Sequence, residues 1–151
     1  MLSLLLHAAA GVAVTAAAFW LNAHLYRGAW PGKRPSALEV AYYLFAVTSV
    51  CAGWYFNVKY VLVEFPEESS WIHYIKMLFT NAAASSGAQD LIITNTFLFP
   101  MWLVSDGPRR GIKAPFIFFV MSLFTSFAFS MALYLAAQER QVRFNQAAGR
   151  G

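Results

Sequence analysis

Asp90 is the residue whose type and position could do chemistry in this sequence. It stands inside the apolar stretch from Asn81 to Arg110, where an ionised carboxylate costs roughly 2.5 kcal/mol or more in hydrocarbon unless it is paired or hydrated. A helix that begins near Asn81 would place Asp90 about 12 Å from its start, at a depth comparable with Lys59 in the preceding apolar stretch. The sequence therefore predicts a structural polar pair of Asp90 with Lys59, joined by Asn57.

A second interpretation of Asp90 needs no partner. If the helix begins at Ser86 instead of Asn81, Asp90 lies in its first turn, where free N–H groups and the helix dipole stabilise a carboxylate. A catalytic or ligand-binding acid is the third interpretation. Pro100 removes a helical hydrogen bond from the same stretch, and the polar residues 94–96 could satisfy the freed groups, so we expect a local kink there.

Two histidines lie in the first apolar stretch and could bind a tetrapyrrole. His7 and His24 stand near its opposite ends, and a neutral imidazole nitrogen can ligate the magnesium of chlorophyll or the iron of haem. Terminal histidines at the level of the membrane interface are the plainer interpretation. The sequence has no paired-cysteine or HExxH pattern, so no metal site is predicted.

Ser122, Ser126 and Ser130 recur every fourth residue in the last apolar stretch. On one continuous helix they would form a small, hydrogen-bonding ridge, which is typical of helix packing inside membranes. Phenylalanines surround this ridge and could face lipid, carotenoid or a partner subunit.

The composition predicts the elements that would position these residues. Apolar residues make up 59% of the chain and charged residues 12%, whereas a soluble domain has about 25% charged residues. We expect an all-α fold and a single integral membrane domain over residues 1–151. Its four transmembrane helices would cover about 2–26, 38–63, 84–105 and 115–137, with one short interfacial amphipathic helix at about 69–80. The S-x-x-E pattern at Ser36 marks a helix start, with Glu39 as a capping carboxylate.

The distribution of basic residues predicts an orientation. Four spans would place both termini on one side and the loops 27–37 and 106–114 on the other. Because these loops hold more Lys and Arg than the opposite side, we expect them on the cytoplasmic or stromal side. The net charge of +4 forms no continuous basic face, so nucleic acid is not an expected partner.

Several passages resemble a known family over about residues 42–141. They are GWYFNVKYVLVEF, FTNAAASSGAQDL, the SDGPRR turn and the closing LYLAAQER. This segment is similar to an uncharacterised family of small three-span membrane proteins of bacteria and phototrophs, distantly grouped with fungal membrane terpene cyclases. The resemblance implies a topology and no established activity. It also implies an acidic residue near the turn, for which Asp106 is the equivalent.

These features favour a non-catalytic accessory subunit of a larger membrane complex. The family's presence in phototrophs makes a photosynthetic supercomplex the specific expectation, in a bacterial inner membrane or a thylakoid. Membrane lipid and other integral membrane subunits would be its partners, and chlorophyll or carotenoid its pigment. The alternative is a small membrane enzyme of terpene-cyclase type, in which Asp90 protonates an apolar polyene inside an aromatic pocket.

Overall fold

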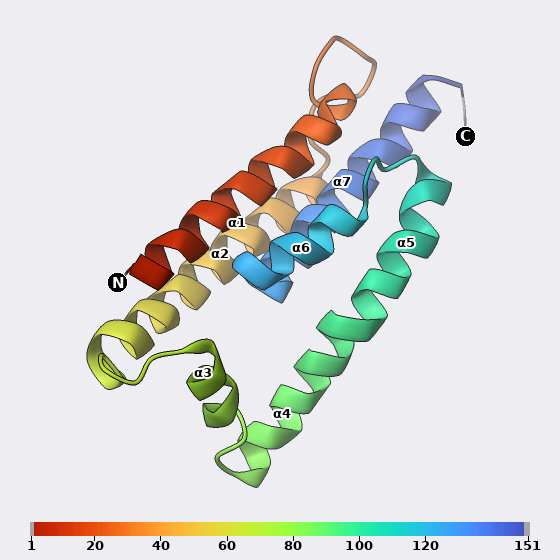
Figure 1. Ribbon diagram of the computed structural model, residues 1–151. Helices are drawn as coiled ribbons and strands as arrows, with labels where there is room; N and C mark the ends of the chain where they lie inside the picture. Colours follow the sequence, from red (N-terminus) through yellow and green to blue (C-terminus); the bar gives the residue numbers. More distant parts are fainter. Residues whose placement is uncertain (1, 150–151) are drawn as a thin grey trace.

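The computed structural model describes residues 2–149, which form helices and connecting turns without a strand (Figure 1). The elements are α1 (Leu2–Leu21), the 3-10 turn η1 (Ala23–Leu25), α2 (Ala37–Lys59), η2 (Tyr60–Glu64), α3 (Trp71–Met77), α4 (Ala82–Ile93), η3 (Thr94–Leu98), α5 (Phe99–Arg110), α6 (Phe116–Phe124) and α7 (Phe127–Ala147). The predicted all-helical class is confirmed. Two helices, Leu4–Leu21 and Ala37–Glu64, are long and apolar enough to cross a membrane.

Side-chain caps set where α2 and α4 begin. The Ser36 hydroxyl accepts a hydrogen bond from the Glu39 amide at 3.1 Å, as the S-x-x-E pattern predicts. The Asn81 side chain accepts from the Ala84 amide at 2.9 Å, so the third long helix starts at Ala82. The alternative start at Ser86 is therefore wrong, and Asp90 lies in the third turn rather than the first. Within the stretch expected to form an interfacial helix, the structure has the shorter helix α3.

Elements α4, η3 and α5 make one continuous helix with a π-helical stretch in the middle. η3 covers residues 94–98 and ends directly before Phe99 and Pro100. Because proline has no N–H, the carbonyl one turn earlier loses its usual donor, and a wider helical turn is a known way to accommodate this. The structure thus has a π segment next to Pro100, where the sequence predicts a kink.

The expected fourth span is not one helix. The chain leaves helical geometry at Thr125, with φ −128° and ψ −96°, and Ser126 caps a new helix by accepting from the Phe129 amide at 3.1 Å. Beyond this point α7 runs back along α6, and the two helices are joined by a hydrogen bond from the Ser130 hydroxyl to the Phe118 carbonyl. The rings of Phe118 and Tyr134 also lie 5.2 Å apart.

This hairpin changes two expectations. Ser122, Ser126 and Ser130 do not form one ridge: Ser122 donates to the Asn95 side chain at 2.8 Å, Ser126 is a cap, and Ser130 closes the hairpin. The start of α1 and the end of α7 also lie at opposite ends of the molecule (Figure 1), whereas four full spans would place them at the same end. The polar segment after Gln138 is helical as far as Ala147.

The tip of the hairpin rests against glycines of the first two helices. A Cβ atom added at Gly11 of α1 would lie 2.7 Å from the Phe124 carbonyl oxygen, and one at Gly53 of α2 would lie 3.9 Å from the Ser126 Cβ. The main helix contacts join α2 to α7, α1 to α6 and α6 to α7. α4 instead stands apart from α1 and α2, toward the end of the molecule opposite the loop that joins α1 to α2 (Figure 1).

We expect Gly11→Ala to destabilise the protein by about 1–3 kcal/mol, because the new methyl group collides with backbone that cannot move aside easily. Gly87→Ala is the matched control, since Gly87 is also helical and a Cβ there meets nothing within 4 Å. Thermal unfolding in detergent measures both variants. Equal midpoints for the two would mean that the hairpin tip does not touch α1.

Candidate functional site

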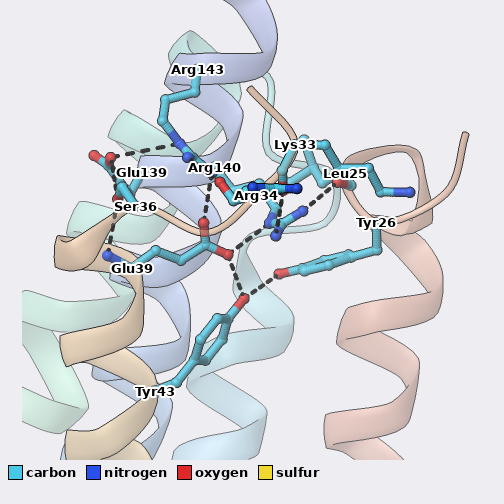
Figure 2. A network of polar contacts seen from close by, with 10 residues as sticks. All are labelled: Leu25, Tyr26, Lys33, Arg34, Ser36, Glu39, Tyr43, Glu139, Arg140 and Arg143. Atoms are coloured by element: carbon cyan, nitrogen blue, oxygen red, sulfur yellow. Dashed lines mark hydrogen bonds and ion pairs between the residues drawn. The ribbon is translucent and has the colours of Figure 1, made fainter. Parts of the chain in front are cut away.

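The Glu39 carboxylate is the most deeply buried charge in the described chain. It is 0% exposed and receives two guanidinium groups of α7 (Figure 2): Nε of Arg140 lies 2.7 Å from one oxygen, and Nη2 of Arg143 lies 2.7 Å from the other. The Tyr43 hydroxyl donates to the same carboxylate at 3.0 Å. Three donors therefore contact the two oxygens of this carboxylate.

Each of the three guanidinium nitrogens of Arg140 donates a hydrogen bond inside the molecule. Its Nη1 donates to the Leu25 carbonyl at 3.1 Å and its Nη2 to the Lys33 carbonyl at 3.2 Å. Its guanidinium carbon also lies 4.8 Å from the centre of the Tyr26 ring, a cation–π distance. Burial raises the pKa of the Tyr26 hydroxyl above its ordinary value. Arg140 therefore fastens the loop between α1 and α2 onto α7.

Arg143 extends the cluster to the surface. Its Nη1 donates to the Arg34 carbonyl at 2.7 Å, and its Nε lies 3.7 Å from Glu139. The Ser36 hydroxyl, which caps α2, also donates to Glu139 at 2.8 Å. The two carboxylates balance the two guanidinium groups, so this cluster offers no uncompensated charge to a substrate. Its geometry is that of a clamp between α2 and α7.

The other polar side of α7 faces α5. Asp106 receives Nε of Arg110 at 2.8 Å, the Tyr134 hydroxyl at 3.3 Å and the Gln138 amide. It is thus the acidic residue that the resemblance pointed to, but its oxygens are occupied by neighbouring side chains. Gln138 and Tyr134 come from α7, so this contact ties the end of α5 to the returning arm of the hairpin.

An open recess of about 500 Å³ lies beside this contact, between η1, the end of α5 and α7. Gln141 of α7 lies in its wall, with its side-chain oxygen 2.9 Å from Nε2 of His24 and its amide donating to Asn145 at 2.8 Å. Asn145 donates in turn to the Arg110 carbonyl at 3.2 Å. The basic side chains of Arg109, Arg110 and Lys113 also line the recess, which makes it positively charged.

The structure does not form the expected pair between Lys59 and Asp90. Lys59 instead pairs with Glu64 at 3.0 Å, because the π-helical turn η2 places the Glu64 carboxylate beside Lys59. Asp90 accepts from the neighbouring Gln89 amide at 3.1 Å and is exposed. Asn57 likewise has no role in a pair with Asp90. The separation of α4 from α2 is the physical reason for this correction.

The two candidate tetrapyrrole ligands lie in different surroundings. His24 uses Nε2 for Gln141, while its Nδ1 is buried without a hydrogen-bond partner in the described chain. His7 lies between aromatic rings, 5.3 Å from the ring of Trp71 and 5.5 Å from that of Phe124. In this conformation neither ring nitrogen of His24 is presented to a bulky cofactor, so its role as a ligand gains no support from the geometry.

The sequence prediction missed the clamp. The sequence pattern assigns Glu39 only a capping role and indicates no partner for Arg140 or Arg143. The capping pattern at Ser36 did locate the carboxylate correctly. Its partners stand more than a hundred residues away in sequence, and only the unrecognised reversal at Thr125 brings them to it.

We expect Glu39→Gln to lower the free energy of unfolding by about 3–5 kcal/mol, because it leaves the buried guanidinium group of Arg140 without its counter-charge. Glu67→Gln removes the same charge from an exposed turn and should leave stability nearly unchanged. Chemical unfolding in mixed micelles measures both. A Glu39→Gln variant as stable as Glu67→Gln would contradict a structural role for the clamp.

Comparison with known proteins assigns the chain to a family. No curated protein and no solved structure matches the chain. A family model described as "Protein of unknown function DUF2834" matches residues 41–140. The match runs from the second residue after Glu39 to Arg140 and thus takes in most of α2, the helix α4–α5 and the hairpin, leaving α1 outside. Because this match covers most of the chain, the protein belongs to the DUF2834 family.

Proposed function

We propose that this is an integral membrane protein crossed by α1, α2 and the α4–α5 helix, with α6 and α7 as a re-entrant hairpin. α1 has 20 residues and reaches about 30 Å, the thickness of a hydrocarbon core. α6 has 9 residues and reaches only about 13 Å. Its tip meets Gly11 near the middle of α1, so it would stop about halfway across.

The basic residues support one orientation for this arrangement. One end of the molecule holds the loop between α1 and α2, the end of α5 and the second half of α7 (Figure 1). Its basic residues are Arg27, Lys33, Arg34, Arg109, Arg110, Lys113, Arg140 and Arg143, whereas Lys59 and Lys76 lie toward the other end. By the positive-inside rule, the loops 27–37 and 106–114 lie on the cytoplasmic or stromal side, together with the end of α7.

Within this membrane, a non-catalytic accessory subunit is the function that the geometry supports best. The outward surface of α4 and η3 carries the proposal. Leu91, Phe97 and Leu98 are exposed there, and α4 packs little against the rest of the chain. Asp90 also lies on this surface, about 24 Å along the helix from Asp106, and a carboxylate facing lipid at that depth is costly. A partner helix that supplies a donor would remove this cost.

A narrower form of the proposal makes the partner a photosynthetic supercomplex with bound chlorophyll or carotenoid. It rests on the resemblance and on His7 and His24 alone. The enzyme alternative uses Asp90 as the acid of a terpene-cyclase-type reaction. Its exposed position leaves the carboxylate accessible to an apolar substrate, although the aromatic pocket that such chemistry needs would have to come from another chain.

A photo-cross-linking residue at Phe97 tests the proposal. Phe97 is 58% exposed on η3, and Leu44 is 64% exposed on α2, so the two positions are matched in accessibility. In native membranes we expect position 97 to give a discrete protein adduct and position 44 to give lipid adducts. Lipid adducts alone from both positions would argue against a partner on the α4–η3 surface.

Substitution of Asp90 separates the accessory role from the enzyme alternative. In the accessory role, Asp90→Asn keeps a hydrogen-bonding group and should weaken the cross-linked complex at most severalfold. If Asp90 is instead a catalytic acid, the same variant loses turnover of a prenyl substrate while the cross-link persists. Cross-link yield and turnover, measured on the same membranes, distinguish the two.

A further inference from the structure

The recess between α5 and α7 holds basic side chains that the rest of the chain does not neutralise. Arg140 and Arg143 are paired with Glu39, and Arg110 is paired with Asp106. Within residues 2–149, the side chains of Arg109 and Lys113 form no hydrogen bond or ion pair, although both line the recess. The recess therefore carries two positive charges in excess of its internal partners.

The position and shape of the recess indicate an amphipathic ligand. His24 lies in η1, directly after α1 ends at Leu21, so the recess stands where a membrane-crossing α1 would meet the lipid headgroups. Pro108 and Phe144 supply apolar parts of its wall. The volume of about 500 Å³ falls in the usual range for a small-molecule site.

We propose that this recess binds the phosphate group of an anionic phospholipid, with Arg109 and Lys113 as the residues that contact it. Guanidinium and ammonium groups are the side chains that bind phosphate oxygens most strongly. Basic pockets between membrane helices on the positively charged side are suited to anionic headgroups. The Asn145 and Gln141 amides lie beside these cations and are held in place by their mutual hydrogen bond.

The occupant is a lipid rather than a soluble phosphate compound, because the recess lies at the level of the lipid headgroups. A headgroup at the end of α1 is anchored by its acyl chains at that depth, which raises its local concentration at the site. The inference rests on the membrane placement proposed above and is independent of any partner subunit.

The experiment uses the full chain in nanodiscs that contain either phosphatidylcholine alone or phosphatidylcholine with phosphatidylglycerol. Native mass spectrometry after release from the disc counts the lipids that remain bound. We expect the wild-type protein to retain phosphatidylglycerol. The variant with both Arg109→Gln and Lys113→Gln should bind this lipid about 30-fold more weakly, since two basic contacts near an anionic surface are lost.

The matched control carries Lys59→Gln and Lys76→Gln, which remove the same total charge from the other end of the molecule. It should retain phosphatidylglycerol as the wild type does. Equal retention by the two double variants, or equal loss from both, would overturn the proposal. So would displacement of the lipid by millimolar glycerol 3-phosphate, which would assign the site to a soluble phosphate compound.

Incorporation into the discs is scored separately for each variant. Failure of the wild-type protein to enter the discs would contradict the membrane placement, and with it this inference. Insertion without any preference for phosphatidylglycerol would overturn the lipid site alone and leave the accessory role standing.

Discussion

The buried Glu39 carboxylate is the constraint on which the rest of the structure depends. A charge removed from water is tolerated only when opposite charge and hydrogen-bond donors replace the lost hydration. Arg140 and Arg143 supply both (Figure 2), and they can do so only if α7 returns to the level at which α2 begins. The clamp and the hairpin therefore require each other, and a straight fourth span would leave Glu39 without both of its guanidinium partners.

α7 contributes both to the clamp around Glu39 and to the basic recess, because two of its sides are polar. Arg140 and Arg143 face α2, whereas Gln138, Gln141 and Asn145 reach toward α5 and η1. The clamp thus fixes the helix that forms one wall of the basic recess. Charges that are balanced inside the fold hold the structure together, and charges that are left unbalanced, at Arg109 and Lys113, remain available for a ligand.

The helical class, the cap at Ser36 and a disturbance of the helix near Pro100 could be predicted, because each depends on residues close together in sequence. The sequence leaves the start of the third long helix open between Asn81 and Ser86. The reversal at Thr125 could not be predicted. The stretch 115–137 is apolar enough to cross a membrane, and serine occurs inside membrane helices as well as at caps, so Ser126 gave no distinct signal. Without this reversal, the sequence could not show that Arg140 and Arg143 lie beside Glu39. The pair of Asp90 with Lys59 failed for a similar reason, since depth along two helices does not show whether they touch.

The side on which α7 ends tests the hairpin most directly. In a Cys51→Ser background, single cysteines at Gly32, Glu67 and Gln146 would be labelled with a membrane-impermeant maleimide in sealed vesicles of both orientations. The hairpin predicts that Gln146 is labelled together with Gly32 of the loop between α1 and α2, and that Glu67 is labelled from the opposite side. Labelling of Gln146 together with Glu67, as four complete spans require, would contradict the account.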